Sequence, residues 1–296
     1  MNVPPHLLRH LMGLRAVVRL RTGVLRAPKA FDFPAVGGPL VVGALGGSGT
    51  RAVVDILREA GVFLGGTLDP LTNDSLAMRA FLYRWFRPLV QAHETGKPFS
   101  KRAFDWLETA VSLHLEAMPE ATQLWGWKNP RSMWLIPFFQ ERFPSMRFLH
   151  LVRDPRDMAL SRNRFLLRTQ GRFLLSSGSG SDPVADQLQL WTRGNTLARD
   201  AGSQLQTGHY MVLRYEELCL EPAQSAARIL SFLGIRSSSD LIERCTALVQ
   251  PAKGLGRGQT LTADGRALPT STRRLMEELG YDSGGDTSKE APFRTG

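Results

Sequence analysis

The segment Pro39–Gly61, PLVVGALGGSGTRAVVDILREAG, constrains the fold of this chain more than any other. It begins with an apolar run, Leu40–Leu45, that is typical of a buried parallel strand. The run breaks at Gly46-Gly47-Ser48-Gly49-Thr50, and an amphipathic helical pattern follows, with Gly61 as an end signal. Backbone N–H groups and the helix dipole at such a junction favour an anion. The alternative is an ordinary strand-to-helix turn that merely uses glycines.

The loop does not match a Walker A motif. That motif requires G-x-x-x-x-G-K-[ST], in which a lysine reaches the β- and γ-phosphates of a nucleotide. Counting from Gly43, the sixth position is Ser48, and no lysine precedes Thr50. We therefore expect a relative of the nucleotide-binding loops that does not hold ATP or GTP in the usual way.

Charge points to an anionic ligand or surface. The net charge is +10 and the pI is about 10.3, which favours nucleotide phosphates, acidic sugars, membrane surfaces or nucleic acid. The 296 residues are long enough to bury the core of one α/β domain with extensions. Cys219 and Cys245 have no disulfide or metal spacing, so we expect buried thiols and a reducing compartment.

The first 31 residues are basic and contain no acid before Asp32. Leucines and valines recur in this arm at roughly helical spacing, which is typical of an amphipathic helix on an anionic membrane or partner. A targeting segment and a helix packed on the domain are the alternatives. No apolar run is long enough to span a membrane. We expect a cytoplasmic protein, with residues 1–30 as a candidate peripheral membrane contact.

Two later segments carry cations in settings that suit an anion. Lys128 and Arg131 lie among tryptophans in Trp125–Phe139, where a partly dry pocket or a solvated loop is expected. Arg153 follows a second buried-strand pattern, Met146–Val152, at the edge where open α/β sheets bind ligands. Ser161 is expected about two turns into a helix that begins at Pro155. An arginine with a serine hydroxyl forms a reasonable phosphate clamp.

The remaining segments complete the expected organisation. Helices are predicted over 73–89, 100–118, 184–201, 216–234 and 272–279, a third strand over Tyr210–Tyr215, a flexible loop over Ser176–Asp182, and a candidate anion loop, with Lys253 and Arg257, over Pro251–Gly258. The predicted domains are a basic arm (1–35), one catalytic domain (36–281) and a flexible tail (282–296).

In chain order these motifs resemble those of the sulfotransferase family that uses 3′-phosphoadenosine 5′-phosphosulfate (PAPS) as donor. Gly46–Thr50 resembles the loop for the 5′-phosphosulfate. Arg153 with Ser161, in the context Arg-Asp-Pro-Arg-Asp, resembles the motif for the 3′-phosphate. Lys128-Asn129-Pro130 resembles the Lys-x-Pro segment near the transferred group.

Two later motifs fit the same resemblance. Tyr215-Glu216-Glu217-Leu218 with Pro222 resembles the segment after the family's later strand, and Gly254–Gly258 resembles the loop that closes over the donor. The resemblance covers about residues 39–260 and leaves the N-terminal arm and the tail unmatched.

The resemblance implies a three-layer α/β fold like that of P-loop NTPases, with a central parallel sheet flanked by helices. It implies transfer of a sulfuryl group from PAPS to a hydroxyl or amine of a carbohydrate, lipid, peptide tyrosine or small metabolite, with no metal needed. The implied donor-binding residues are Gly46, Gly47, Ser48, Gly49, Thr50, Arg51, Arg153, Ser161, Tyr215, Gly256 and Arg257. Lys128 would stabilise charge on the leaving group.

The chain departs from the family pattern at the loop. Relatives commonly have a lysine or arginine directly before Ser-Gly-Thr, where this chain has Gly47, and a second threonine where it has Arg51. Arg51 would supply the displaced positive charge. The alternatives are that Arg51 faces solvent and Lys128 acts alone, or that efficient catalysis has been lost.

The general base is open at this point. An acceptor hydroxyl needs a carboxylate or histidine within hydrogen-bond reach. Asp69 and Asp74 lie in the region that can serve in relatives, and His93 is a further candidate. Asp74 could instead cap a helix, given its neighbours Asn73 and Ser75.

Three other functions are alternatives to a sulfotransferase. A P-loop kinase or NTPase would turn over ATP with Mg²⁺, but the Walker lysine is missing. A nucleic-acid-binding protein would concentrate its basic and aromatic residues on one surface, but here the charge is spread. A relative that binds the nucleotide without turnover is the third alternative.

Overall fold

The structure is a computed structural model that describes residues 37–175, 180, 182–250, 254–258, 261 and 267–282, together with Val18. Predictions for the N-terminal arm, for most of Ser176–Asp182, for Lys253 and for the tail beyond Asp282 lie outside these residues. Within the described chain, no helix combines the length and the apolar character needed to cross a membrane.

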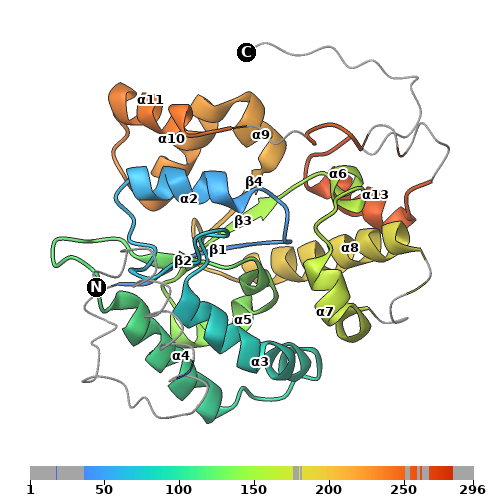
Figure 1. Ribbon diagram of the computed structural model, residues 1–296, viewed down its shortest axis with the longest axis horizontal. Helices are drawn as coiled ribbons and strands as arrows, with labels where there is room; N and C mark the ends of the chain where they lie inside the picture. The colour runs from blue at the N-terminus through green and yellow to red at the C-terminus, as the bar shows by residue number, and fades with distance from the viewer. Residues whose placement is uncertain are drawn as a thin grey trace, which may run out of the picture. The chain divides into compact units, whose positions relative to one another are not determined.

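The centre of the protein is a parallel sheet (Figure 1). Its strands are β1 (Leu40–Ala44), β2 (Gly126–Lys128), β3 (Arg147–Val152) and β4 (Tyr210–Arg214), in the order β2-β1-β3-β4. Every residue of β1 is buried, as expected for a strand covered on both faces. In register, Val42 of β1 lies beside Lys128 of β2 and Leu149 of β3, so the carboxyl ends of all strands meet at one edge.

Helices cover both faces of this sheet. Figure 1 shows α2 (Thr50–Glu59), α10 (Pro222–Leu233) and α11 (Ser239–Ala247) on one side, and α3 (Leu76–Glu94), α4 (Lys101–Leu115) and α5 (Ile136–Arg142) on the other. The other elements are η1 (Pro130–Trp134), α6 (Pro155–Ala159), α7 (Phe165–Leu174), α8 (Pro183–Gly202), α9 (Tyr215–Leu220) and α13 (Thr270–Glu278). The predicted α/β class with a helix-flanked parallel sheet is confirmed.

An aromatic cluster fills the layer between the sheet and helices α3 to α5. The Phe138 ring stacks at 4.7 Å on Phe104 and at 5.8 Å on Phe81, and Phe139 packs edge-on against Trp127 of β2 at 5.2 Å. Such pairs add about 0.5–1.5 kcal/mol each beyond the area they bury. The segment Trp125–Phe139 therefore belongs to the core, as a short strand followed by two helices, and the alternative of a solvated loop is wrong.

A buried histidine ties the sheet to α8. His150 of β3 contacts the Tyr210 hydroxyl through Nδ1 at 2.7 Å and Asn195 Oδ1 through Nε2 at 2.9 Å. Burial lowers its pKa to about 4, although the hydrogen bond to Asn195 opposes that shift. His150 is therefore a neutral part of the core near neutral pH.

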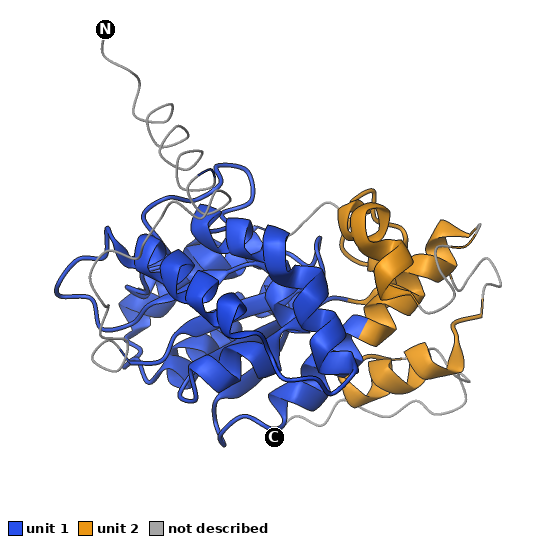
Figure 2. Ribbon diagram, turned by 90° about the horizontal axis from the view of Figure 1, so that it is seen from below, with its two compact units in different colours: residues 1–153, 194–252 blue, residues 154–193, 253–296 orange. Residues whose placement is uncertain are grey.

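The chain divides into two compact units (Figure 2). The first, residues 1–153 and 194–252, contains the whole sheet. The second, residues 154–193 and 253–296, contains α6, α7, the first half of α8 and α13. Inside the second unit, the Thr192 and Thr272 hydroxyls lie 2.8 Å apart, and the Asp186 carboxylate accepts the Gly180 N–H.

Two predicted helices differ from the structure at candidate site residues. The helix expected from Asn73 begins at Leu76, because Asn73 is left-handed (φ 59°) and Ser75 is the N-cap, its Oγ accepting the Met78 N–H. Asp74 is therefore not the helix cap. The helix that begins at Pro155 ends at Ala159, so Ser161 does not lie two turns inside it.

The end of α6 has a local cause. The Ser161 Oγ accepts the N–H of Asn163 at 3.1 Å, a turn that competes with helix continuation. A new helix, α7, then begins at Phe165.

Candidate active site

The loop between β1 and α2 has the backbone of an anion cradle. Gly47 and Gly49 have φ values of 103° and 88°, a region that suits glycine. Gly49 occupies the N-cap position of α2 and has no side chain with which to cap the helix. The Ser48 and Thr50 side chains are buried beside it. The first N–H groups of α2 therefore point from a glycine loop whose backbone an anion can approach closely.

The ends of β3 and β4 meet this loop. Arg153, which follows β3 and is 6% exposed, donates through Nη1 to the Gly47 carbonyl at 3.3 Å. Its guanidinium lies 4.8 Å from the centre of the Tyr215 ring, at the start of α9 after β4. The same ring packs against Gly49, because a Cβ there would lie 2.1 Å from Tyr215 Cε2. Four predicted donor-binding residues, Gly47, Gly49, Arg153 and Tyr215, are therefore linked by these contacts.

Gly49 allows a clean test of this packing. Gly49→Ala should lower the free energy of unfolding both through the positive φ and through the clash with Tyr215. Gly61→Ala is the matched control, because Gly61 has φ 81° with nothing within 4 Å of an added Cβ. We expect a cost of about 1 kcal/mol at Gly61 and roughly 1–3 kcal/mol more at Gly49. Equal costs in urea unfolding would contradict the contact.

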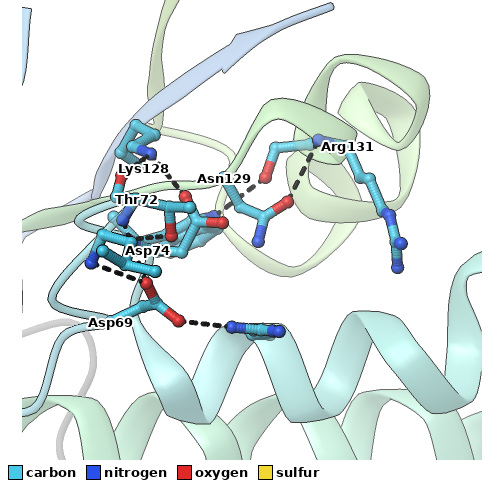
Figure 3. A network of polar contacts seen from close by, with 10 residues as sticks. Asp69, Thr72, Asp74, Lys128, Asn129 and Arg131 are labelled. Atoms are coloured by element: carbon cyan, nitrogen blue, oxygen red, sulfur yellow. Dashed lines mark hydrogen bonds and ion pairs between the residues drawn. The ribbon is translucent and has the colours of Figure 1, made fainter. Parts of the chain in front are cut away.

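A buried lysine stands at the end of β2. Lys128 is 2% exposed, and its Nζ donates to Asp74 Oδ1 at 2.5 Å and to the Thr72 carbonyl (Figure 3). Burial lowers the pKa of Lys128; Asp74 opposes this, and the positive charge of Arg51 adds to it. The exposed Arg51 thus lies close enough to Lys128 to act on it electrostatically.

The two candidate carboxylates have different tasks. Asp69 Oδ1 accepts the backbone N–H groups of Leu71 and Thr72, both at 2.9 Å, and Oδ2 pairs with Arg79 at 2.6 Å. Burial would raise the pKa of Asp69, but these hydrogen bonds and Arg79 lower it overall. Asp69 shapes the loop before α3, whereas Asp74 contacts Lys128 directly.

Other predicted residues lie further from this pair. His93 is in the last turn of α3, roughly 26 Å along the helix axis from its start, so it does not join Asp74. Asn129 caps η1 by accepting the Arg131 N–H at 3.0 Å. The Arg131 side chain extends away from Lys128 (Figure 3), and its guanidinium lies 5.6 Å from the centre of the Phe86 ring.

Comparison with known proteins identifies the family. The family model described as "Sulfotransferase family" matches residues 39–239, about two thirds of the chain. This chain belongs to the sulfotransferase family. Carbohydrate sulfotransferase 1 of Rattus norvegicus is 33% identical over 101 residues, a match that covers 31% of this chain and 24% of that relative. The match thus spans about a quarter of the length of that protein.

Solved structures confirm the sulfotransferase fold. A sulfotransferase from Mycobacterium avium superposes with a TM-score of 0.60 at 13% identity, covering 91% of this chain and 84% of that one. The sulfotransferase domain of the Synechococcus PCC 7002 olefin synthase gives a TM-score of 0.52 at 18% identity, covering 87% and 98%.

The second unit explains part of the Arg-Asp-Pro-Arg-Asp motif of this sulfotransferase. Asp154 caps α6 by accepting the Arg156 N–H at 2.7 Å and pairs with the Arg156 guanidinium at 2.6 Å. The buried Asp157 carboxylate accepts the N–H groups of Gly256 at 3.0 Å and of Gly258 at 2.7 Å. The motif therefore holds the 254–258 turn onto α6.

The contacts of the last predicted donor residues are local. Arg257 donates to the Asp157 carbonyl at 2.9 Å, and the Ser161 Oγ accepts the Asn163 N–H. A role of Ser161, Gly256 and Arg257 in donor binding stays a prediction. Among the described residues, no three or more His, Cys, Asp or Glu are grouped so as to hold a metal ion.

The sequence did not identify every residue at this site. The Thr72 carbonyl holds Lys128, but a backbone acceptor has no sequence signal. His114 of α4 contacts Ser75, which follows Asp74, and Gly126, which lies two residues before Lys128. Its position on the buried face of α4, beside Leu107, Val111 and Leu115, is typical of a core residue.

Proposed function

We propose that this sulfotransferase transfers a sulfuryl group from PAPS to a hydroxyl or amine of its acceptor. The observation that carries the proposal is the buried Lys128–Asp74 pair at the same sheet edge as the glycine loop and Arg153. A carbohydrate hydroxyl is the first acceptor to test, because the partial match to carbohydrate sulfotransferase 1 includes 31% of this chain.

The donor would bind through charge and backbone N–H groups. The α2 terminus with Gly47 and Gly49 would hold the 5′-phosphate, as helix N-termini hold anions elsewhere. Arg153 would pair with the 3′-phosphate, which distinguishes PAP-type nucleotides from ATP. Its guanidinium is held in place by Tyr215 and by the Gly47 carbonyl, so little side-chain freedom is lost on binding.

The transfer itself would need charge stabilisation and a base. The acceptor oxygen attacks sulfur, the bond from sulfur to the bridging phosphate oxygen breaks, and the acceptor proton leaves. Lys128 would stabilise the negative charge that grows on the departing phosphate, with Arg51 adding to it. Asp74 would receive the proton, because its carboxylate lies next to Lys128 whereas Asp69 serves the loop.

Calorimetric titration tests the donor class. Wild-type protein should bind 3′,5′-adenosine bisphosphate (PAP) without added metal and at least tenfold more tightly than 5′-AMP or ATP. Arg153→Ala should weaken PAP binding roughly 30-fold or more and leave 5′-AMP binding nearly unchanged, because only the 3′-phosphate contact is removed.

Arg147→Ala is the matched control. Arg147 begins β3, at the end of the strand opposite to Arg153, and donates to the Leu233 carbonyl. This variant should bind PAP like the wild type. Equal affinity for ATP and PAP would favour a kinase-like protein, and absent PAP binding would reject the proposed donor. Transfer of labelled sulfate from PAPS to sugars then tests the reaction.

A further inference from the structure

His114 joins the two chain segments that carry Lys128 and Asp74. Its Nδ1 lies 2.8 Å from Ser75 Oγ, and its Nε2 lies 2.7 Å from the Gly126 carbonyl oxygen. Ser75 directly follows Asp74, and Gly126 precedes Lys128 by two residues on β2. One imidazole therefore bridges the start of α3 and the strand that presents the lysine.

The contacts determine which ring nitrogen carries the proton. A carbonyl oxygen can only accept, so Nε2 must donate to Gly126. Burial lowers the pKa of His114 to about 4, although the hydrogen bond to Gly126 opposes that shift, so the ring is neutral near pH 7 and Nδ1 is an acceptor. Ser75 Oγ then donates its hydroxyl proton to Nδ1 and accepts the Met78 N–H at 3.3 Å. In this series of hydrogen bonds, the Met78 N–H donates to Ser75 Oγ, Ser75 donates to His114 Nδ1, and His114 Nε2 donates to the Gly126 carbonyl.

The bridge also satisfies the outer side of an edge strand. β2 lies at one end of the strand order, and the Gly126 N–H on that side is bound by the Phe63 carbonyl at 2.9 Å. The Gly126 carbonyl accepts a hydrogen bond from His114. Without it, this carbonyl would be a buried acceptor with no partner on the outer side of β2. An added Cβ at Gly126 would lie 1.9 Å from the Leu40 carbonyl oxygen, so the close approach of β2 to β1 at this position requires glycine.

The surroundings leave the imidazole little freedom. Phe63 packs edge-on against it at 5.9 Å, and an added Cβ at Gly65 would lie 2.5 Å from its Cε1. The ring is 3% exposed. A buried group held on all sides can fix the geometry of what it binds.

We propose that His114 is a positioning residue, whose bridge from Ser75 to Gly126 sets the distance between the Asp74 carboxylate and the Lys128 ammonium. The proposal rests on the proposed function of that pair. His114 contacts neither Lys128 nor Asp74 through a hydrogen bond of its own in this network, so it acts through the backbone of their neighbours. Misplacement of reacting groups by about 1 Å can cost roughly 100-fold in rate.

Two substitutions break the bridge from opposite ends. His114→Gln keeps an amide donor near the position of Nε2 and loses the acceptor at Nδ1, and Ser75→Ala removes the hydroxyl. Each should lower kcat for sulfuryl transfer roughly 10- to 100-fold and leave PAP affinity within about twofold, because the donor residues are not touched. The double variant should be no slower than the slower single variant, since both break the same bridge.

His150→Gln is the matched control for stability. His150 is equally buried, makes two side-chain hydrogen bonds and has a pKa lowered to about 4, but its partners are Tyr210 and Asn195. It should lose stability and keep its kcat. Equal losses of kcat in the two histidine variants, or an unchanged kcat in His114→Gln, would overturn the positioning role.

A second measurement does not depend on catalysis. The Lys128 ammonium should give a slowly exchanging ¹⁵N signal in nuclear magnetic resonance spectra, assigned by its loss in Lys128→Met. We expect this signal in the wild type and in His150→Gln, and its loss by fast exchange in His114→Gln. A signal unchanged in His114→Gln overturns the proposal even if PAPS is not the donor. A wild type without transfer activity but with the expected signals would reject the proposed function alone.

Discussion

Replacing Lys128 with methionine should lower the turnover of sulfuryl transfer roughly 100- to 1,000-fold and leave the affinity for PAP within about twofold. Methionine is close in length and apolar, so it fits a site that is 2% exposed. What it removes is the positive charge that would meet the departing phosphate, and single electrostatic stabilisers of this kind contribute about that much to rate. The measurement is kcat with labelled PAPS, together with calorimetric binding of PAP.

Two further variants give this prediction its specificity. Lys101→Met at the exposed start of α4 makes the same chemical change and should leave kcat unchanged. The Asp74→Asn variant should also have a lowered kcat for sulfuryl transfer. In a double-mutant cycle, Lys128→Met and Asp74→Asn should be strongly non-additive, because the two side chains act as one pair. If the Lys128→Met variant keeps a third or more of the wild-type turnover, Lys128 does not stabilise the departing phosphate.

The sequence predicted the fold where the determinants are local. The strand β1, the glycine loop and α2 follow each other within about twenty residues, so periodicity and glycine positions define them. Gly61 ends α2 as predicted, with φ 81° and the Val62 N–H bound to the Leu57 carbonyl at 2.9 Å. Strands β3 and β4 were predicted for the same reason, because each is a short apolar run before a polar junction.

The sequence failed where the determinants are distant. His114 is defined by partners 39 and 12 residues away along the chain, and β2 is a three-residue strand whose sheet position depends on Leu40. Asp69 and Asp74 are five residues apart and chemically identical, so only the structure separates the carboxylate that shapes a loop from the one that meets Lys128. Ser161 is a different kind of failure, because there a local contact, the Asn163 N–H donated to the Ser161 Oγ, outweighed the helical pattern.

Acid should destabilise this protein well before its carboxylates titrate. His114 and His150 are both buried with pKa values of about 4, against 6.5 for an exposed histidine. Between these values the unfolded chain binds protons that the folded chain excludes, so the free energy of unfolding rises with pH and falls as pH drops from 6.5 toward 4. At pH 5 each histidine should cost on the order of 2 kcal/mol relative to pH 7.5, which together is a large share of the 5–15 kcal/mol typical of a domain.

Urea unfolding at pH 7.5, 6 and 5 measures this dependence, and the histidine variants assign it. His114→Gln and His150→Gln should each be less stable than the wild type at pH 7.5, since each loses buried hydrogen bonds. Each should also show a shallower fall between pH 7.5 and 5, because one of the two excluded protons is gone. If instead the wild-type stability is flat from pH 7.5 to 5, the two histidines take up protons in the folded state over the same pH range as in the unfolded chain, and both are charged at pH 5. The Ser75–His114–Gly126 bridge would then lack its acceptor at Nδ1.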